Sequence, residues 1–234
     1  MNKRIIPTRD RKTRFWPKQR NTFGLLPGLE NTCPGATTGD GGCWHVQKGR
    51  RCPLCYAERL RRCYKNIHRV MAHNTRLMTR ASQREMENYL TAEFDRFTAE
   101  EQIRGVQHLH YRLHWSGDIF SERYAKALAN AINKHRNIKF WNYTRSFKWV
   151  KHFQGLPNLV LFLSLDEVNK EEGLRCFTAN KKKLCLRLAY MGERNALRLK
   201  PCPVDEGRLR FEYGCANCRG CWKAARPVFF KAAS

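Results

Sequence analysis

The chain has 234 residues, of which 42% are hydrophobic and 12% aromatic, so it can bury a core and is not a disordered polypeptide. Its 45 Lys and Arg residues outnumber 20 Asp and Glu residues, giving a net charge of +25. A membrane-spanning helix needs about 20 apolar residues, and no apolar run in this sequence is that long. The first residues also lack the apolar core of a secretory signal. We therefore expect a cytoplasmic protein without a membrane partner. So large a charge opposes compaction unless a polyanion neutralises it, which favours nucleic acid, DNA or RNA, as the partner.

Eight of the eleven cysteines fall into two groups of four. The first has the spacing C-x9-C-x8-C-x2-C and the second C-x12-C-x2-C-x2-C. In a long chain with an odd cysteine count and no export signal, such spacings favour metal-binding thiolates over disulfides. Zinc and iron–sulfur clusters both fit: three thiolates on a [4Fe–4S] cluster leave one iron open, and four close the site. The predicted ligands are Cys33, Cys43, Cys52 and Cys55, and then Cys202, Cys215, Cys218 and Cys221. The isolated Cys63, Cys176 and Cys185 are predicted to be small core residues.

The first 20 residues hold eight Lys or Arg and one acid, which predicts an irregular basic arm. Arg11, Lys12 and Arg14 are its candidate phosphate contacts; the alternative is a disordered tail that aids solubility. Residues 21–55 are rich in Gly, Pro, Thr and Cys and have no periodicity. A loop of this length is normally functional, and metal at the cluster loop, residues 29–55, would supply order that packing cannot.

A helix is predicted over 56–79 from the apolar spacing of Leu60, Tyr64, Ile67 and Met71. Arg62, Arg69 and Arg76 lie seven residues apart and share another face of that helix. Together with Arg61 and Lys65 they form a candidate phosphate-binding flank; an ordinary solvated face is the alternative.

Helices and strands alternate after this point. Helices are predicted over 83–98, from the N-cap Ser121 onward, over 146–153 and over 167–176. Strands are predicted over 107–115, 138–144, 159–165, 184–190 and 208–213. The first strand alternates between two faces: one face has Leu109, Tyr111, Leu113 and Trp115, and the other has His108, His110, Arg112 and His114. This order predicts an α/β fold with a mostly parallel sheet, a partial (β/α) barrel. We expect the arm at 1–20, the barrel at 21–200 and a C-terminal four-cysteine metal module at 201–234.

Small, polar or charged residues follow four of these strands. In α/β folds ligands bind at the carboxyl ends of the strands, so these ends predict a binding rim. Turn chemistry alone also favours such residues there. The segments are Ser116-Gly117-Asp118, Thr144-Arg145-Ser146, Asp166-Glu167 and Gly192-Glu193-Arg194, of which the first two are the candidate cofactor-binding residues.

The segment from Arg51 to Glu58, RCPLCYAE, resembles the end of the cluster motif of radical S-adenosylmethionine enzymes. More specifically, the chain is similar to the phage "gene product 88" family and related radical-SAM-like phage proteins. The matching segments are 21–28, 32–36, 52–57, 115–121, 143–146 and 215–222.

The resemblance implies a partial barrel, a cluster on Cys43, Cys52 and Cys55, an auxiliary cluster on the terminal four cysteines, and a place in the host cytoplasm. It also implies contacts of Ser116, Gly117 and Asp118 with the methionine end of S-adenosylmethionine. One departure stands out: eight residues separate Cys43 from Cys52, where that motif has three.

Two functions from different classes remain open. The first is an iron–sulfur enzyme of radical-SAM type that acts on nucleic acid, with Trp16, Trp44 and Trp115 available to stack bases. The second is a non-enzymatic nucleic-acid-binding protein whose four-cysteine sites hold zinc or iron–sulfur structurally. A phage structural protein would explain the charge but not the paired cysteines.

Overall fold

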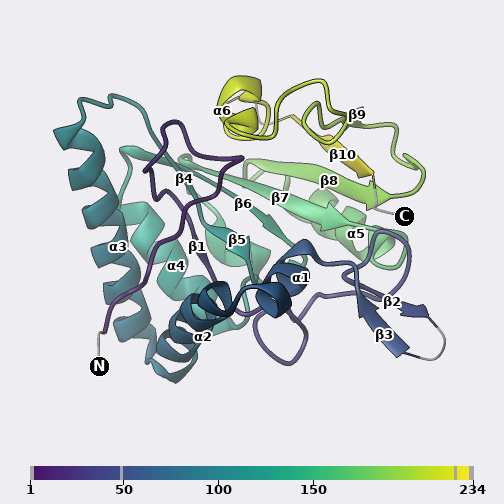
Figure 1. Ribbon diagram of the computed structural model, residues 1–234, viewed down its shortest axis with the longest axis horizontal. Helices are drawn as coiled ribbons and strands as arrows, with labels where there is room; N and C mark the ends of the chain where they lie inside the picture. Colours follow the sequence, from purple (N-terminus) through teal and green to yellow (C-terminus); the bar gives the residue numbers. More distant parts are fainter. Residues whose placement is uncertain (1–2, 48–49, 224–225, 232–234) are drawn as a thin grey trace.

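The computed structural model describes residues 3–47, 50–223 and 226–231, without the side chains of His45, Gln47 and residues 50–53. Among these residues six strands form one sheet in which all neighbours are parallel. The sheet curls as a half-barrel (Figure 1), which confirms the predicted α/β fold and parallel sheet. The strand order is β4 (Leu109–Arg112), β6 (Ile138–Thr144), β7 (Leu159–Leu165), β8 (Leu186–Gly192), β10 (Val228–Lys231) and β9 (Lys200–Pro201).

Helices cover one face of this sheet and enclose the main core with it. They are α3 (Gln83–Ile103), α4 (Glu122–Lys134), the 3-10 helix η1 (Phe147–Phe153) and α5 (Lys170–Asn180). The stripe Met86, Leu90, Phe94 and Phe97 is buried as predicted. Ser121 caps α4 as predicted, since its Oγ accepts a hydrogen bond from the Tyr124 amide at 3.2 Å. No described helix combines the length and the apolarity that a membrane span requires.

The helix predicted over 56–79 is two helices. Helix α1 (Tyr56–Cys63) ends at Tyr64, whose backbone is extended with φ −121° and ψ 104°, and α2 (Lys65–Arg80) follows. The break turns Tyr64 outward and lets α2 bury its own face, on which Met71 and Met78 are inaccessible to solvent. The predicted stripe was wrong because tertiary packing of α2, not continuous periodicity, decides which face is buried.

The strand predicted over 107–115 is also divided. After β4 the chain leaves the main sheet, and β5 (His114–Ser116) pairs in parallel with β1 (Phe23–Gly24). The change of sheet reverses the alternation, so that His114 is buried at 3% exposure and Trp115 only half-buried.

Two further strand predictions need correction. The strand predicted at 184–190 is β8 and lies two residues later. No strand forms at 208–213, where the chain turns and Phe211 is exposed, because this segment belongs to the C-terminal module instead of the sheet.

The C-terminal module covers the other face of the sheet. Side chains that alternate with the main core, Phe162 and Ala189 among them, pack with Cys202, Val204 and Val228 in a second, smaller apolar cluster. The short helix α6 (Gly214–Cys218) lies above this face, next to β9 and β10 (Figure 1). The concave face of the half-barrel is therefore largely filled by the chain itself.

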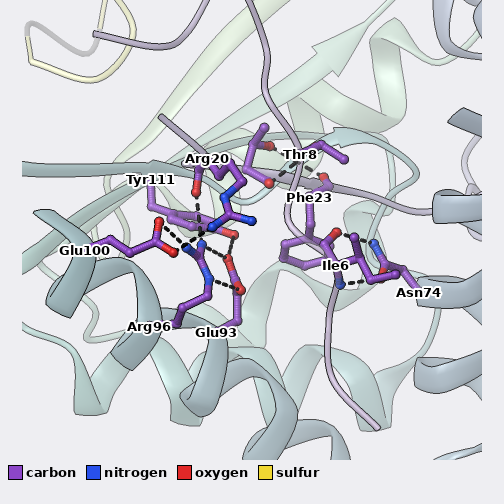
Figure 2. A network of polar contacts seen from close by, with 10 residues as sticks. Ile6, Thr8, Arg20, Phe23, Asn74, Glu93, Arg96, Glu100 and Tyr111 are labelled. Atoms are coloured by element: carbon purple, nitrogen blue, oxygen red, sulfur yellow. Dashed lines mark hydrogen bonds and ion pairs between the residues drawn. The ribbon is translucent and has the colours of Figure 1, made fainter. Parts of the chain in front are cut away.

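The N-terminal segment, residues 3–22, is irregular but packs on the body of the protein. The buried Asn74 side chain of α2 clamps Ile6, accepting from its amide at 2.8 Å and donating to its carbonyl at 3.0 Å (Figure 2). Thr8 and Thr22 form an isolated antiparallel bridge. Farther along, Arg96 of α3 donates to the carbonyl of Arg20 at 3.1 Å. These contacts fix the path of the predicted basic arm.

Candidate metal centres and nucleic-acid surface

A hairpin closes the unusually long spacing between Cys43 and Cys52. Strands β2 (Trp44–Gln47) and β3 (Arg50–Pro53) pair antiparallel. At their base the Cys43 carbonyl accepts hydrogen bonds from the amides of Leu54 and Cys55, each at 3.0 Å. The extra residues between Cys43 and Cys52 therefore form a hairpin, and the hairpin brings Cys43 next to Cys55.

Cys33 joins the same neighbourhood from the other end of the loop. Its amide donates to the Gly28 carbonyl at 3.0 Å. Burial raises the pKa of the Cys33 thiol well above its usual value, and nearby Asp118, Cys43 and Cys55 raise it further. Three of the four predicted ligands thus lie within electrostatic range of one another.

Cys55 stands immediately before α1. Burial raises the pKa of its thiol, while the first-turn amides of Glu58 and Ala57 act in the opposite direction, as a helix N-terminus does toward negative charge. The effect of burial on the pKa is the larger one. The Cys33 and Cys55 thiols therefore stay protonated unless a cation replaces their protons.

The predicted cofactor-binding residues converge beneath this loop. Asp118 is buried and accepts hydrogen bonds from the amides of Ile119 at 2.7 Å and Arg145 at 2.8 Å. The Ser146 amide donates to Thr144 Oγ1 at 3.0 Å, which places both residues at the same strand end.

Ser116 and Gly117 hold the segment that leads to Cys33. Ser116 Oγ donates to the Leu25 carbonyl at 2.8 Å. Gly117 has φ +81°, and a Cβ there would stand 2.6 Å from both Leu25 Cβ and Thr32 Oγ1. Only glycine allows this close approach.

Arg145 connects the strand ends with the cysteine loop. Its guanidinium pairs with Asp166 and donates to Thr37 Oγ1 at 2.7 Å and to the Gly41 carbonyl at 2.9 Å. Burial opposes the charge, but Cys43 and Asp166 hold the pKa of Arg145 above its ordinary value. A positive charge therefore lies beside the cysteine loop.

The next strand end makes similar contacts. The Glu193 amide donates to Asp40 at 3.1 Å. Gly41, at φ +68°, approaches the Met191 carbonyl so closely that no Cβ would fit. The strand ends thus hold the cysteine loop in place through the groups that the sequence suggested for a ligand.

The second cysteine group gathers around α6. Cys215 and Cys218 lie on the helix, and the Cys202 amide donates to the Phe229 carbonyl at 2.9 Å. Cys221 Sγ accepts a hydrogen bond from the Tyr143 hydroxyl at 2.9 Å.

Burial dominates the acidity of these thiols as well. It raises the pKa of Cys215 to about 12, and Cys221 adds to this effect. Burial raises the pKa of Cys221 to about 11, with Cys202 and Cys218 contributing. Cys202, Cys215 and Cys218 thus lie within electrostatic range of Cys221.

The N-terminal segment supplies cations to this second group. The Lys12 carbonyl accepts from the Cys215 amide at 2.9 Å, and Lys12 Nζ lies 3.3 Å from Asp205. Burial lowers the pKa of Lys12, but Asp205, Cys215 and Cys202 raise it more. Arg11 and Arg14 both pair with Glu212.

Neither cysteine group forms a complete metal site among the described side chains. Among the described side chains, no three His, Cys, Asp or Glu stand close enough to hold an ion. The side chain of Cys52 lies outside the described part of the structure. The donor chemistry nevertheless fits a thiophilic metal, because half-buried or buried thiols lie near fixed positive charge in segments with little apolar content of their own.

The predicted phosphate contacts separate into two sets. Arg11, Lys12, Arg14, Arg61 and Arg62 have ion-pair partners, the last two sharing the buried Glu58. Lys65, Arg69 and Arg76 are exposed on α2 and have no ion-pair partner among the described residues. The exposed Arg80 lies on the same face and was missed. The break at Tyr64 removes Arg62 from this face, which corrects the prediction of one continuous flank.

The isolated cysteines differ from expectation, whereas the stacking role of the tryptophans stays a prediction. Cys63 is exposed, which contradicts a core role, and Cys176 and Cys185 are half-buried. Trp16 lies under the Arg104 guanidinium at 3.7 Å. Trp44 lines a shallow groove with Arg61 and Arg62.

Sequence reasoning missed three residues between the two cysteine groups: Tyr56, Arg112 and Tyr143. Arg112 stands on the polar side of a strand, where a solvated role is the usual inference. In the structure Arg112 is instead paired with Asp10 of the N-terminal segment and is only 14% exposed.

Comparison with known proteins identifies relatives of the chain. The family model "Gene product 88" matches residues 2–224. The "Gene 88 protein" of Mycobacterium phage L5 is 32% identical over 222 residues, which cover 90% of this chain and 86% of that protein. The "Gene 88 protein" of Mycobacterium phage D29 is 32% identical over 151 residues, or 64% of this chain and 58% of that protein. No solved structure matches. The chain therefore belongs to the gene product 88 family of phage proteins.

Proposed function

We propose that this protein is a cysteine-ligated metalloprotein that binds nucleic acid during phage infection. The observation that carries the proposal is that one chain holds two groups of half-buried or buried cysteines and an exposed cationic helix face. Cys33, Cys43, Cys52 and Cys55 would hold one centre, and the four cysteines from Cys202 to Cys221 the other. Zinc would supply cross-links only, whereas a [4Fe–4S] cluster would also supply redox chemistry.

Electrostatics supports metal binding at both groups. Four thiolates around a divalent ion are net negative, and Arg145 at the loop and Lys12 at the C-terminal group place positive charge beside them. Without metal, burial raises the pKa of the Cys33, Cys55, Cys215 and Cys221 thiols, so these thiols are neutral and contribute only weak polar contacts.

Helix α2 supports nucleic-acid binding. Lys65, Arg69 and Arg76 share a face opposite Met71 and Met78. Unpaired cations on a rigid helix can neutralise phosphates without first breaking ion pairs.

Metal analysis of anaerobically purified protein tests the first half of the proposal. We expect two bound metal centres per chain, and loss of the loop centre in Cys55→Ala while the C-terminal centre stays. Cys63→Ala is the matched control, since Cys63 is exposed and outside both groups. Absence of metal from the wild type, or unchanged metal in Cys55→Ala, contradicts the proposal.

Fluorescence anisotropy with labelled DNA and RNA oligonucleotides tests the second half. On duplex DNA the Arg69→Gln, Arg76→Gln double variant should reduce the slope of log affinity against log salt by about 1.8, or about 0.9 per phosphate contact. Arg123→Gln removes an exposed arginine of α4 and should leave the slope unchanged. An equal effect of both variants would assign binding to overall charge instead of to α2.

A radical-SAM type enzyme is the second candidate. The parallel half-barrel and the position of the cysteine loop across its strand ends favour it. Its test is S-adenosylmethionine cleavage by the anaerobic, reduced protein. A colourless protein that contains zinc and no iron would eliminate this candidate and leave the first.

A further inference from the structure

Arg112 occupies the space between the two cysteine groups. It ends β4 on the face opposite the main core, and its side chain is 14% exposed. Nη1 donates to Asp10 at 2.8 Å, which anchors the guanidinium to the N-terminal segment. Nε is buried and has no acceptor among the described residues.

One arm of Arg112 reaches the cysteine loop. Nη2 donates to the Tyr56 hydroxyl at 3.4 Å. Tyr56 directly follows Cys55, and its hydroxyl in turn donates to the Trp115 carbonyl. The Tyr56 ring is half exposed, but the hydroxyl fixes the first residue of α1 to the sheet.

The other side of Arg112 reaches the C-terminal group. The guanidinium lies 5.9 Å from the ring centre of Tyr143, whose hydroxyl donates to Cys221 Sγ at 2.9 Å. One side chain therefore contacts a neighbour of each cysteine group.

We propose that Arg112 is a positioning residue shared by both centres, so that occupancy of the C-terminal group holds Tyr56 and with it the Cys55 end of the loop. The inference rests on the proposed metal binding but not on which metal is bound. A negatively charged metal–thiolate centre would draw the guanidinium toward Tyr143 and Cys215, and the Arg112–Tyr56 hydrogen bond would carry that constraint to α1.

The test measures the alkylation rate of Cys55 by mass spectrometry in the anaerobic full-length protein. Cys221→Ser weakens the distant group, and we expect it to accelerate Cys55 alkylation about fivefold or more. Arg112→Gln should itself accelerate the alkylation of Cys55. Adding Cys221→Ser to Arg112→Gln should then cause no further acceleration. Tyr143→Phe keeps the ring and removes the hydroxyl, so it should accelerate the alkylation of Cys55 less than Cys221→Ser does. This variant tests the same link if Arg112→Gln folds poorly.

Arg96→Gln is the matched control, because Arg96 is also paired within the protein but contacts Glu93 and Glu100, not the cysteine groups. In that background Cys221→Ser should keep its full effect. An unchanged Cys55 rate in Cys221→Ser, or effects of Arg112→Gln and Cys221→Ser that simply multiply, would overturn the inference.

Metal content separates the two proposals. Metal in the wild type without coupling removes only the role of Arg112. A metal-free wild type in which Cys221→Ser still accelerates Cys55 removes the metal centres and with them the effect of occupancy, and it leaves Arg112 only as a packing link between the two cysteine groups. A metal-free wild type without that response removes both.

Discussion

The two faces of the sheet are stabilised in different ways. The helix-covered face buries a continuous apolar core that includes Phe94, Phe140 and Leu161. The concave face has a small apolar cluster, the C-terminal cysteine group and ion pairs such as Lys12–Asp205, and the other cysteine group lies in the loop at the strand ends. The first can fold by burial alone, whereas the second depends on polar contacts and, in our proposal, on metal.

Truncation in the main core gives the largest expected effect. Phe140→Ala should lower the free energy of unfolding by about 3–5 kcal/mol, because a fully buried ring on β6 leaves a cavity. Urea unfolding measures the loss. The same loss with and without chelator would support a core that is independent of metal; a chelator-dependent loss would break the distinction between the faces.

Acid should weaken the junction between β5 and α4. Burial lowers the pKa of His114 to about 3, and its ring hydrogen-bonds the Tyr124 hydroxyl at 2.7 Å. Since unfolding restores a pKa near 6.5, this contribution to stability is complete above about pH 6.5 and is lost as pH falls toward 3, by up to about 1.4 kcal/mol per pH unit.

Urea unfolding between pH 7 and pH 4 measures that slope. His114→Gln should flatten it, while His68→Gln on α2, whose ring is not buried, should not. An identical slope in His114→Gln would show that other groups set the acid sensitivity.

Chelation should affect the concave face and the cysteine loop but not the helix-covered face. Hydrogen exchange of the Cys215 amide, which bonds to the Lys12 carbonyl, should accelerate about tenfold or more, equivalent to about 1.4 kcal/mol. Amides of α3 and α4 serve as the internal control and should keep their protection. Uniform acceleration across both faces would contradict the comparison.

The smallest expected effect is the loss of a helix cap on the helix-covered face. Ser82 forms a capping box with Glu85 at the start of α3. Ser82→Ala should cost about 1 kcal/mol in urea unfolding, with metal content unchanged. A change in metal content would show that the two faces are coupled through α3.

Local patterns determined much of this architecture. The period of Met86, Leu90, Phe94 and Phe97 and the apolar runs of β6 and β7 depend on neighbours in sequence, so the elements and the parallel order were predictable. The cysteine spacing likewise predicted two groups of four ligands, and in the structure Cys43 adjoins Cys55 at the base of a hairpin.

Only the tertiary structure decided how the polar residues are used. Lys12 pairs with Asp205, Arg145 bonds Thr37, and Arg112 lies between Tyr56 and Tyr143. These partners are far apart in the chain, and a charged side chain has the same local pattern whether it faces solvent, phosphate or a buried partner. The sequence by itself therefore determined the scaffold and the donor atoms, while the docking of the N-terminal segment and C-terminal module decided which charges stay free to bind a ligand.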